Sequence, residues 1–308
     1  MIEKLKRSGN LGFLLAVLLV KTYRYLGYGK FGDEFYLKKS FYKAHGYKLN
    51  LSNPKSLNEK IQWLKLNDRR SINTQLADKY AVRDYILQHF GEQYLIPLLF
   101  HTTDTDDLKP EHLPETPFII KSNHDSGNFV VVRNKSQVNW DNVRLKFKWC
   151  MAFNYYHFHR EWQYNGIEPR ILVEQLLVQK NGRIPNDYKL HCINGEVAFI
   201  YVSVDREVEN KRNIYDKEWN PLYFTFAQKK KNIENLRGNE IEPPSSFAQM
   251  IEFAEKIARL YPYVRIDFYD VDGRLYFGEV THHHGGGFDQ IRPVEWDYKL
   301  GENIDLNI

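Results

Sequence analysis

The stretch from Tyr263 to Thr281 constrains the fold more than any other part of the chain. Apolar and polar residues alternate in its first half, which is typical of a strand with one buried face. The dipeptide Asp272-Gly273 follows, and it favours a tight turn between antiparallel strands. A loop formed by residues 271 to 273 would pair Asp270 with Arg274. The sequence therefore predicts a β-hairpin with this register.

Charged side chains in this hairpin need partners if the strands are half-buried. In the predicted register Arg265 lies opposite Glu279, and Asp267 lies on the same face one step away. Neighbouring carboxylates raise each other's pKa unless a cation lies between them. Mg2+ held by carboxylates and substrate phosphates is one solution, and a cross-strand salt bridge is the alternative. Under the metal hypothesis, loss of one carboxylate is expected to stabilise the metal-free protein.

The composition suits a folded cytoplasmic protein. The chain has 308 residues, of which 43% are hydrophobic and 15% aromatic, so it can bury a large core in one or two domains. A net charge of +4 is too mild to indicate a nucleic-acid partner, although it suits an anionic small substrate or a membrane surface. The cysteines are Cys150 and Cys192, without a CxxC motif. We expect free thiols in a reducing cytoplasm.

The first 55 residues are expected to form a helical N-terminal segment. Residues 1 to 7 are basic, and the apolar run from Leu11 to Val20 is too short to span a bilayer. This part of the chain has two interpretations. It is a helix packed on the domain, or a basic and aromatic helix (residues 1–25) in peripheral contact with the inner membrane.

A helix begins cleanly after this segment, because Ser56 and Glu59 have the spacing of a capping box. A second helix is predicted from about Thr74 to His89. Lys79 and Arg83 lie off its apolar stripe, so the periodicity indicates a solvated face for both.

Two further strand regions carry isolated charges. Residues 118–132 form a strand, a small polar loop and a strand, with Lys121 placed at the end of the first like a phosphate-binding lysine. A long hairpin turn is the alternative. Glu174 lies within an apolar strand, where it needs a donor from an arginine or a ligand.

Residues 187–202 form a hairpin around Asn194-Gly195, a dipeptide typical of a type I′ turn.

Taken together, these motifs occur in an order that resembles the ATP-grasp superfamily. Four of them are similar to the TupA-like ATP-grasp proteins of bacterial surface-polysaccharide loci, over roughly residues 50 to 301. The motifs are Ala77–Arg83, Asp187–Lys189, Tyr263–Asp267 and Glu295–Gly301. One position departs from the superfamily pattern, because Thr281 stands where a metal-binding asparagine is usual, and His282–His284 follow it. A threonine hydroxyl is a weak Mg2+ ligand. The histidine run is a poor zinc site, because adjacent histidines point in different directions.

The resemblance implies roles for individual residues. ATP would be bound by Lys121, His124, Ser126, Gly127, Glu174, Gln175, Leu177, Asp187 and Lys189. Mg2+ would be bound by Asp267, Glu279 and Thr281. Arg265 and Lys189 would act in catalysis by stabilising charge on the transferring phosphoryl group.

Within the ATP set, the roles follow the parts of the nucleotide. Lys121 and Lys189 would hold phosphates, and the loop of His124, Ser126 and Gly127 would cover them. Glu174 would accept from the adenine amino group, with the backbone from Gln175 to Leu177 lining the base. Asp187 would take a ribose hydroxyl.

The resemblance also implies an α+β ATP-grasp fold in residues 56–308, with two subdomains closing on ATP: a lid of about residues 115–170 and a C-terminal subdomain of about 171–301. The implied reaction is ATP- and Mg2+-dependent ligation of a carboxylate to an amine through an acyl phosphate, on small-molecule or sugar-linked substrates in capsule or O-antigen biosynthesis. The alternatives are a glycosyltransferase of a polysaccharide locus and a non-catalytic nucleotide-binding assembly factor.

Overall fold

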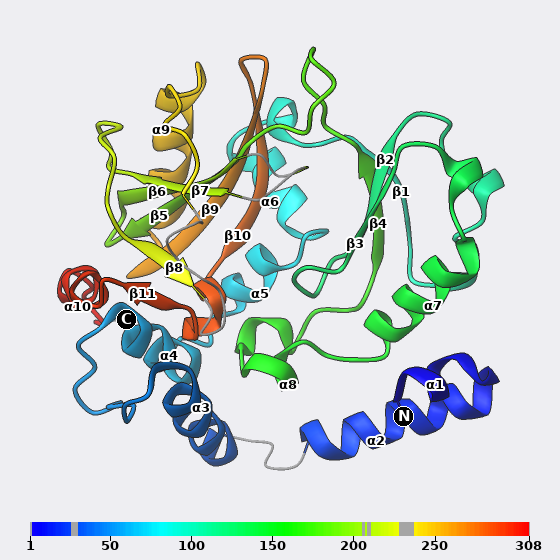
Figure 1. Ribbon diagram of the computed structural model, residues 1–308, viewed down its shortest axis with the longest axis horizontal. Helices are drawn as coiled ribbons and strands as arrows, with labels where there is room; N and C mark the ends of the chain where they lie inside the picture. Colours follow the sequence, from blue (N-terminus) through cyan, green and yellow to red (C-terminus); the bar gives the residue numbers. More distant parts are fainter. Residues whose placement is uncertain (1, 26–29, 205–206, 208–210, 228–236, 308) are drawn as a thin grey trace.

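Two large antiparallel sheets, a small two-stranded sheet and the helices packed on them make up the computed structural model in Figure 1. It describes residues 2–25, 30–204, 207, 211–227 and 237–307. The predicted α+β class is confirmed, because the strand pairings of the described residues are all antiparallel and helices are packed on both large sheets.

The elements have the following bounds. The α-helices are α1 Ile2–Arg7, α2 Gly9–Tyr25, α3 Lys30–His45, α4 Leu57–Asn67, α5 Ser71–Ala77, α6 Val82–His89, α7 Trp140–Met151, α8 Tyr156–His159, α9 Phe247–Ala258 and α10 Glu295–Glu302. The strands are β1 Leu98–Thr102, β2 Phe118–Ser122, β3 Phe129–Val132, β4 Ile171–Gln175, β5 Asp187–Ile193, β6 Glu196–Val204, β7 Lys211–Tyr215, β8 Thr225–Ala227, β9 Tyr263–Val271, β10 Arg274–Thr281 and β11 Gln290–Arg292. Short 3-10 helices are η1 Glu92–Tyr94, η2 Thr105–Asp107, η3 Pro110–His112, η4 Lys135–Gln137, η5 Trp162–Tyr164 and η6 His284–Gly287.

The larger sheet has the strand order β10-β9-β5-β6-β7, so the β9–β10 hairpin pairs with the β5–β6 hairpin. Helix α9 covers one face, where Met250, Phe253 and Ile257 pack against buried side chains of the sheet. Helix α4 and the small β8–β11 sheet cover part of the other face, where Phe199 and Phe226 are buried. The charged residues of the hairpin lie on this second face.

The smaller sheet has the order β1-β4-β2-β3 and packs against α7 through Phe147, Ile120 and Ile171. Figure 1 shows this sheet standing across from the larger one. Strands β1 and β4 belong to this sheet, although they lie outside residues 115–170, the lid expected from the sequence. The sequence did not show this pairing, because β1 and β4 lie far apart along the chain: β1 precedes the predicted lid and β4 follows it. We propose residues 98–175 as the lid.

The N-terminal segment forms α1, α2 and α3, and residues 46–55 after them are irregular. Helix α2 packs on the domain through Phe13, whose ring lies 6.1 Å from that of Trp149 in α7. Among the described residues, no helix combines the length and apolarity needed to cross a membrane. The packed-helix interpretation therefore accounts for one side of α2.

Local motifs with strong signals have the predicted structure. Ser56 caps α4 by accepting from Glu59 N at 3.2 Å, and Glu59 Oε2 accepts from Ser56 N at 3.2 Å. Asn194 and Gly195 both have positive φ, at 49° and 90°, as a type I′ turn requires. The predicted helix from Thr74 to His89 is wrong, because α5 ends at Ala77 and α6 begins only at Val82.

The predicted register of the β9–β10 hairpin is also wrong at its turn. Arg274 pairs with Val271, so the turn has two residues instead of three. Such a turn alone would move Glu279 to the opposite face. A bulge restores the face, because Phe277 pairs with Phe268 whereas Glu279 pairs with Asp267.

Gly278 is the residue that this bulge inserts. A Cβ at this position would lie 2.9 Å from the carbonyl oxygen of Asp267, so the close strand approach requires glycine. As a result Glu279 lies opposite Asp267, and Thr281, rather than Glu279, lies opposite Arg265.

Candidate active site

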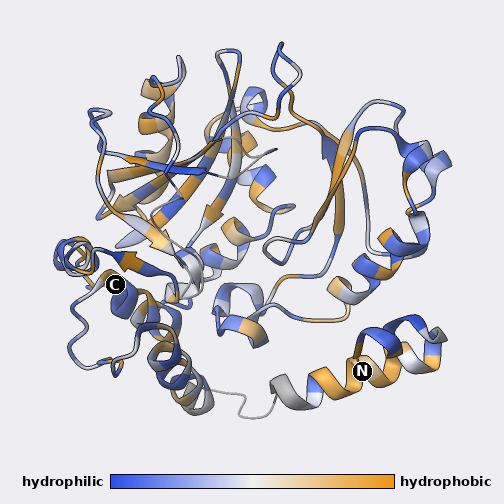
Figure 2. Ribbon diagram, viewed as in Figure 1, coloured by the Kyte–Doolittle hydropathy of each residue, from blue (hydrophilic) through white to orange (hydrophobic). Residues whose placement is uncertain are grey.

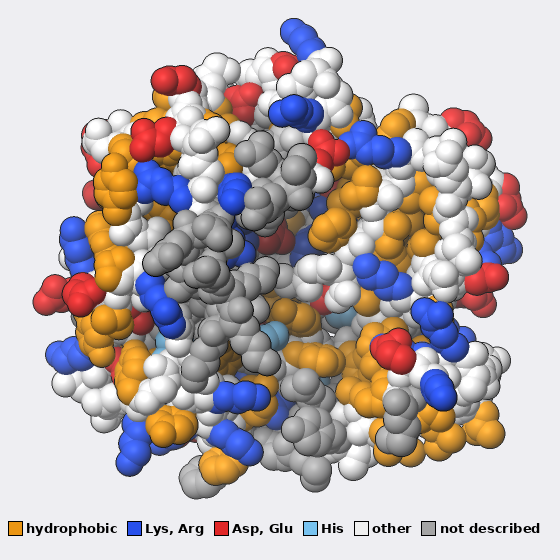
Figure 3. All heavy atoms as spheres, in the orientation of Figure 1, with side chains coloured by type: hydrophobic (Ala, Val, Ile, Leu, Met, Phe, Trp, Pro, Cys, Tyr) orange, Lys and Arg blue, Asp and Glu red, His pale blue; other side chains and the backbone are white. Residues whose placement is uncertain are grey.

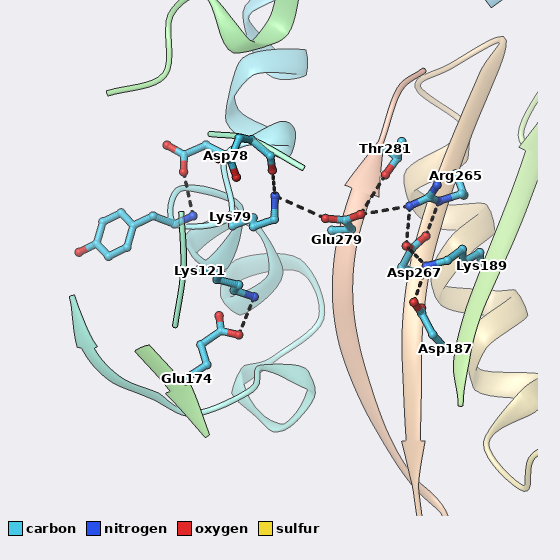
Figure 4. Close-up of polar contacts among 12 residues, drawn as sticks. Asp78, Lys79, Lys121, Glu174, Asp187, Lys189, Arg265, Asp267, Glu279 and Thr281 are labelled. Carbon is cyan, nitrogen blue, oxygen red and sulfur yellow. Dashed lines mark hydrogen bonds and ion pairs between the residues drawn. The ribbon is translucent and has the colours of Figure 1, made fainter. Parts of the chain in front are cut away.

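A cluster of opposite charges occupies one face of β5, β9 and β10 (Figure 4). Arg265 binds Asp267 with two hydrogen bonds, each of 2.6 Å, and its Nη2 lies 3.1 Å from Glu279 Oε1. Lys189 Nζ donates to Asp267 Oδ2 at 2.8 Å and also to Asp187. The structure therefore brings together Arg265, Asp267, Glu279, Lys189 and Asp187. Strand alternation predicted the first three on one face, whereas only the family resemblance pointed to Lys189 and Asp187.

The pKa shifts in this cluster keep its members charged. Burial lowers the pKa of Arg265 and of Lys189, but Asp267 and the other carboxylates outweigh burial, so both pKa values are raised. Burial raises the pKa of Glu279, whereas Lys79, Arg265 and Lys189 outweigh this and hold it below its usual value. Each carboxylate has a cation beside it, so the mutual repulsion expected from the sequence is already compensated.

Lys79 joins the cluster, although its periodicity had suggested a solvated face. It lies in the turn between α5 and α6, and its side chain is only 14% exposed. Nζ lies 3.5 Å from Glu279 Oε2 and donates to the carbonyl oxygen of Asp125 at 2.6 Å. The sequence signal that could have identified Lys79 was the Ala77–Arg83 motif, which spans the break between α5 and α6.

Lys121 and Glu174 form a second charged site, in the smaller sheet. Lys121 Nζ lies 2.6 Å from Glu174 Oε2, and Arg83 Nη1 lies 3.6 Å from Glu174 Oε1. The sequence suggested either an arginine or a ligand as partner for Glu174, and the structure supplies a lysine first and an arginine second. A small cavity lined by Lys79, Arg83, Glu174 and Gly278 lies between this pair and the larger sheet.

The loop after β2 is anchored by its histidine. His124 is 1% exposed, and Nε2 lies 3.2 Å from the carbonyl oxygens of both Cys150 and Phe153. Burial lowers its pKa, which favours a neutral ring that donates from Nε2. His124 thus holds the loop against α7, and its phosphate-covering role stays a prediction. Ser126 and Gly127 are exposed at the loop tip, where a covering role is sterically open.

The remaining predicted residues occupy mixed positions. The backbone N–H of Gln175 donates to the carbonyl oxygen of Pro97 at 3.0 Å, so this amide is engaged within the protein. Leu177 is half-buried just beyond β4. Thr281 Oγ1 donates to Glu279 Oε1 at 3.3 Å, which places its hydroxyl beside the carboxylate pair.

His284 is a partner that the sequence did not predict. Its Nδ1 lies 2.8 Å from Arg265 Nη1, and burial together with Arg265 and Lys189 lowers its pKa well below the usual value. The neutral ring therefore accepts from the guanidinium. The only signal was the histidine run after Thr281, which the sequence alone did not connect to Arg265.

The carboxylates fit a Mg2+ ion that arrives with phosphates. The described residues contain no group of three His, Cys, Asp or Glu side chains able to hold a metal. Asp267 and Glu279 nevertheless face each other across β9 and β10 and share Arg265. Mg2+ is commonly bound by one or two carboxylates together with substrate phosphates, and this donor set matches that pattern.

Comparison with solved structures returns ligases and a synthetase at low similarity. The D-alanine–D-alanine ligase from Bacillus anthracis is 15% identical with a TM-score of 0.39, covering 67% of this chain and 56% of that one. The ATP-grasp ligase PsnB complexed with minimal precursor is 12% identical with a TM-score of 0.39, covering 77% and 59%. The ADP complex of purK, an N5-carboxyaminoimidazole ribonucleotide synthetase, is 12% identical with a TM-score of 0.38, covering 73% and 50%.

The family comparison is more specific. The chain spans between 50% and 59% of the length of these three structures, and no curated protein matches it. In contrast, the sequence model of the family described as TupA-like ATPgrasp matches residues 59–305, which include both charged sites. The chain belongs to the TupA-like ATP-grasp family.

Proposed function

We propose that the protein is an ATP- and Mg2+-dependent ligase that joins a carboxylate to an amine in the biosynthesis of a bacterial surface polysaccharide. The observation that carries the proposal is the arrangement in Figure 4. The Arg265–Asp267–Lys189 cluster on the larger sheet faces the Lys121–Glu174 pair, with Lys79 between them.

ATP would lie between the two sheets. Lys121 and Lys189 would bind phosphates, Glu174 the adenine amino group and Asp187 a ribose hydroxyl. Lys79 adds a third cation, since it lines the cavity and its Nζ lies 3.5 Å from Glu279 Oε2. Because Lys121 is paired with Glu174 in the nucleotide-free protein, binding would exchange this ion pair for contacts with ATP.

Asp267 and Glu279 would hold Mg2+, with Thr281 contributing its hydroxyl. The ion would neutralise phosphate charge during transfer. Arg265 is held by Asp267 on two of its nitrogens and by His284 on a third. This bonding fixes the guanidinium plane, so that it can stabilise charge on the phosphoryl group without reorganisation.

The reaction has two balanced steps. A carboxylate oxygen of the first substrate attacks the γ-phosphorus of ATP, the bond to the bridging oxygen breaks, and ADP leaves. The neutral amine of the second substrate then attacks the acyl carbon, phosphate leaves with the bonding pair, and the amine loses a proton. The products are an amide, ADP and phosphate, formed where ATP is available in the cytoplasm.

Incubation with ATP, Mg2+ and panels of sugar acids and amines tests the proposal. Release of ADP that requires the acid, and trapping of the acyl phosphate by hydroxylamine as a hydroxamate, would support it. Use of a nucleotide sugar without ATP would favour the glycosyltransferase. ATP binding without turnover on any panel would favour a non-catalytic assembly factor.

A further inference from the structure

A second pocket lies on the same side of the larger sheet as the charged cluster. It has a volume of about 210 Å³ and is lined by Arg237 and by residues of β7, β8, β11 and the segment before β8, among them Arg212, Tyr223, Thr225 and Arg292. This space can hold several water molecules, so a single sugar ring is a suitable occupant.

The strand register relates this pocket to the cluster. Asp187 pairs with Ser203, which in turn pairs with Arg212. Directly paired residues point to the same face of a sheet, so Arg212 and Asp187 share the face that carries Lys189. Their strands are separated by one intervening strand, which is about 10 Å. An extended substrate could therefore reach from the pocket to the phosphoryl-transfer site.

Two polar atoms in this pocket are buried without a hydrogen-bond partner among the described residues: Arg212 Nε and Thr225 Oγ1. Arg212 uses another nitrogen, Nη1, to donate to the carbonyl oxygen of Phe226 at 2.8 Å. Buried polar groups are satisfied in the great majority of cases. Both atoms are shielded from solvent, so the groups that a ligand with acceptor oxygens would meet are the arginine N–H groups at the pocket surface.

The other arginines add one unpaired charge and an aromatic surface. Arg237 is paired with Glu240, whose Oε1 lies 3.1 Å from its Nη2, and its guanidinium lies 4.4 Å from the ring centroid of Tyr223, which is 68% exposed. Arg292 donates to the neutral Gln290 at 2.6 Å, so its charge remains uncompensated by that contact. Arginines bind carboxylates and phosphates through paired N–H groups, and an exposed tyrosine ring offers a flat apolar surface to a sugar.

We infer that this pocket binds an anionic sugar. In the proposed reaction, this sugar would be a part of the substrate other than the carboxylate that is phosphorylated. The inference rests on the proposed function for the identity of the reacting group, but the pocket's affinity for the sugar can be measured without ATP. A hexuronic acid and a hexose phosphate are the two sources of the required chemistry, and the experiment separates them.

The experiment measures binding of glucuronic acid and of glucose 1-phosphate by saturation-transfer NMR, without ATP, to the full chain and its variants. Arg292→Gln removes an exposed arginine of the pocket, and Arg259→Gln removes an exposed arginine at the end of α9 as a matched control. We expect one of the sugars to bind, with about ten-fold weaker affinity in Arg292→Gln and equal affinity in Arg259→Gln.

The outcomes separate the two ideas. Binding of glucuronic acid identifies a carboxylate ligand, and binding of glucose 1-phosphate alone identifies a phosphate ligand. If neither sugar binds, or if Arg292→Gln binds as well as wild type, the pocket inference is wrong. Sugar binding that Arg292→Gln weakens, in a protein that never turns over ATP, would retain the pocket and contradict the proposed ligase.

Helix α2 carries an independent feature. Leu11, Leu14, Leu15, Leu18 and Leu19 form one helical face, and they are between 46% and 74% exposed. The opposite face packs on the domain through Phe13 and Ala16, which are buried. Figure 2 shows this helix as strongly hydrophobic, and Figure 3 shows apolar side chains gathered at the lower right of the molecule, where Figure 1 places α2.

Neighbouring helices supply positive charge. Lys4 and Arg7 of α1 are exposed, as are Lys38 and Lys39 of α3. Figure 1 places α2 and α3 along the same lower edge, and Phe35 of α3 is 69% exposed. Leucines flanked by exposed lysines, arginine and an aromatic residue match the chemistry of an anionic phospholipid surface.

We propose that this face binds the surface of an anionic bilayer, with the leucines inserted at the level of the headgroups. Sedimentation with phosphatidylcholine vesicles, with and without phosphatidylglycerol, tests it on the full chain. The double variant Leu14→Ser/Leu18→Ser should lose binding at least about ten-fold, whereas Leu87→Ser, an equally apolar surface change on α6 at 50% exposure, should not.

Electrostatic attraction predicts that added salt weakens the binding and that phosphatidylglycerol strengthens it. Failure of the wild type to sediment with either vesicle would overturn the proposal. A dimer in light scattering that the double leucine variant abolishes would instead identify a second copy of the chain as the occupant.

Discussion

The two charged sites on opposite sheets are built differently. In the smaller sheet, Lys121 meets Glu174 in a close pair, and Arg83 is the more distant cation at 3.6 Å. In the larger sheet, Arg265 binds Asp267 through two nitrogens while Lys189 binds the same carboxylate. The first site is a simple ion pair, and the second is a network in which each charge has several partners.

The difference indicates which site can rearrange. Lys121 has one carboxylate within ion-pair distance in the described structure, so ATP phosphates can replace that carboxylate in a single exchange. Asp267 is 2% exposed and holds two cations, so displacing it would leave buried charges unpaired. We therefore expect the larger sheet to be preorganised and the smaller sheet to adjust when nucleotide binds.

Replacement of Asp267 by Asn should have the largest effect. It leaves Arg265 and Lys189 without their shared carboxylate, so the free energy of unfolding should fall by about 3 kcal/mol. Turnover of ATP should fall by at least about 100-fold. Urea denaturation and ADP release measure the two effects. Unchanged stability would mean that the network is not preorganised, and the comparison between the sheets would fail.

Glu279→Gln should separate catalysis from stability. Glu279 is 33% exposed at its side chain, so its ion pairs are worth less than about 1 kcal/mol. Turnover should nevertheless fall about 100-fold, because one of the Mg2+ carboxylates is lost. The same assays apply, and a large loss of stability with retained activity would make the hairpin a structural salt bridge.

Lys121→Ala should weaken ATP binding about ten-fold and leave the fold intact, because a charged hydrogen bond to phosphate is lost. Lys135→Ala is a matched control, since both lysine side chains are 17% exposed but Lys135 donates to the carbonyl oxygens of Pro110 and Leu113. Calorimetry with ATP decides. Equal ATP affinities of the wild type and Lys121→Ala would remove Lys121 from the phosphate site.

The smallest effect is the pH dependence of Glu279. Its pKa is below the unfolded value of about 4.3, so its contribution to stability is present above that pH and is lost as the pH falls through the folded pKa. The difference in Tm between wild type and Glu279→Gln should therefore shrink as the pH is lowered from 7 to about 3. A difference that grows on acidification would contradict the lowered pKa.

Strong local signals in the sequence predicted local structure well. The capping box at Ser56 and the Asn194-Gly195 turn both depend on neighbouring residues, and both have the predicted geometry. The residues of the charged cluster were also predicted, because strand alternation and the motif resemblance both select Arg265, Asp267 and Glu279.

What the sequence could not show depends on contacts between distant segments. The bulge at Gly278 follows from its approach to the Asp267 carbonyl oxygen, and a glycine in a strand does not by itself locate a bulge. Lys79 appeared solvated because its position was judged from a continuous helix, whereas that helix is broken in the structure. Its partner Glu279 lies 200 positions away along the chain. His124 was assigned to the ligand because the sequence did not show its actual acceptors, which lie in α7 and just beyond it.

Calorimetric titration of ATP with and without Mg2+ tests the central proposal most directly, that the Asp267–Glu279 face binds Mg-ATP. Wild type should bind ATP at least about ten-fold more tightly with Mg2+ than without it, and Glu279→Gln should lose that difference. If wild type shows no dependence on Mg2+, or if Glu279→Gln retains the full dependence, this face is not the metal–nucleotide site.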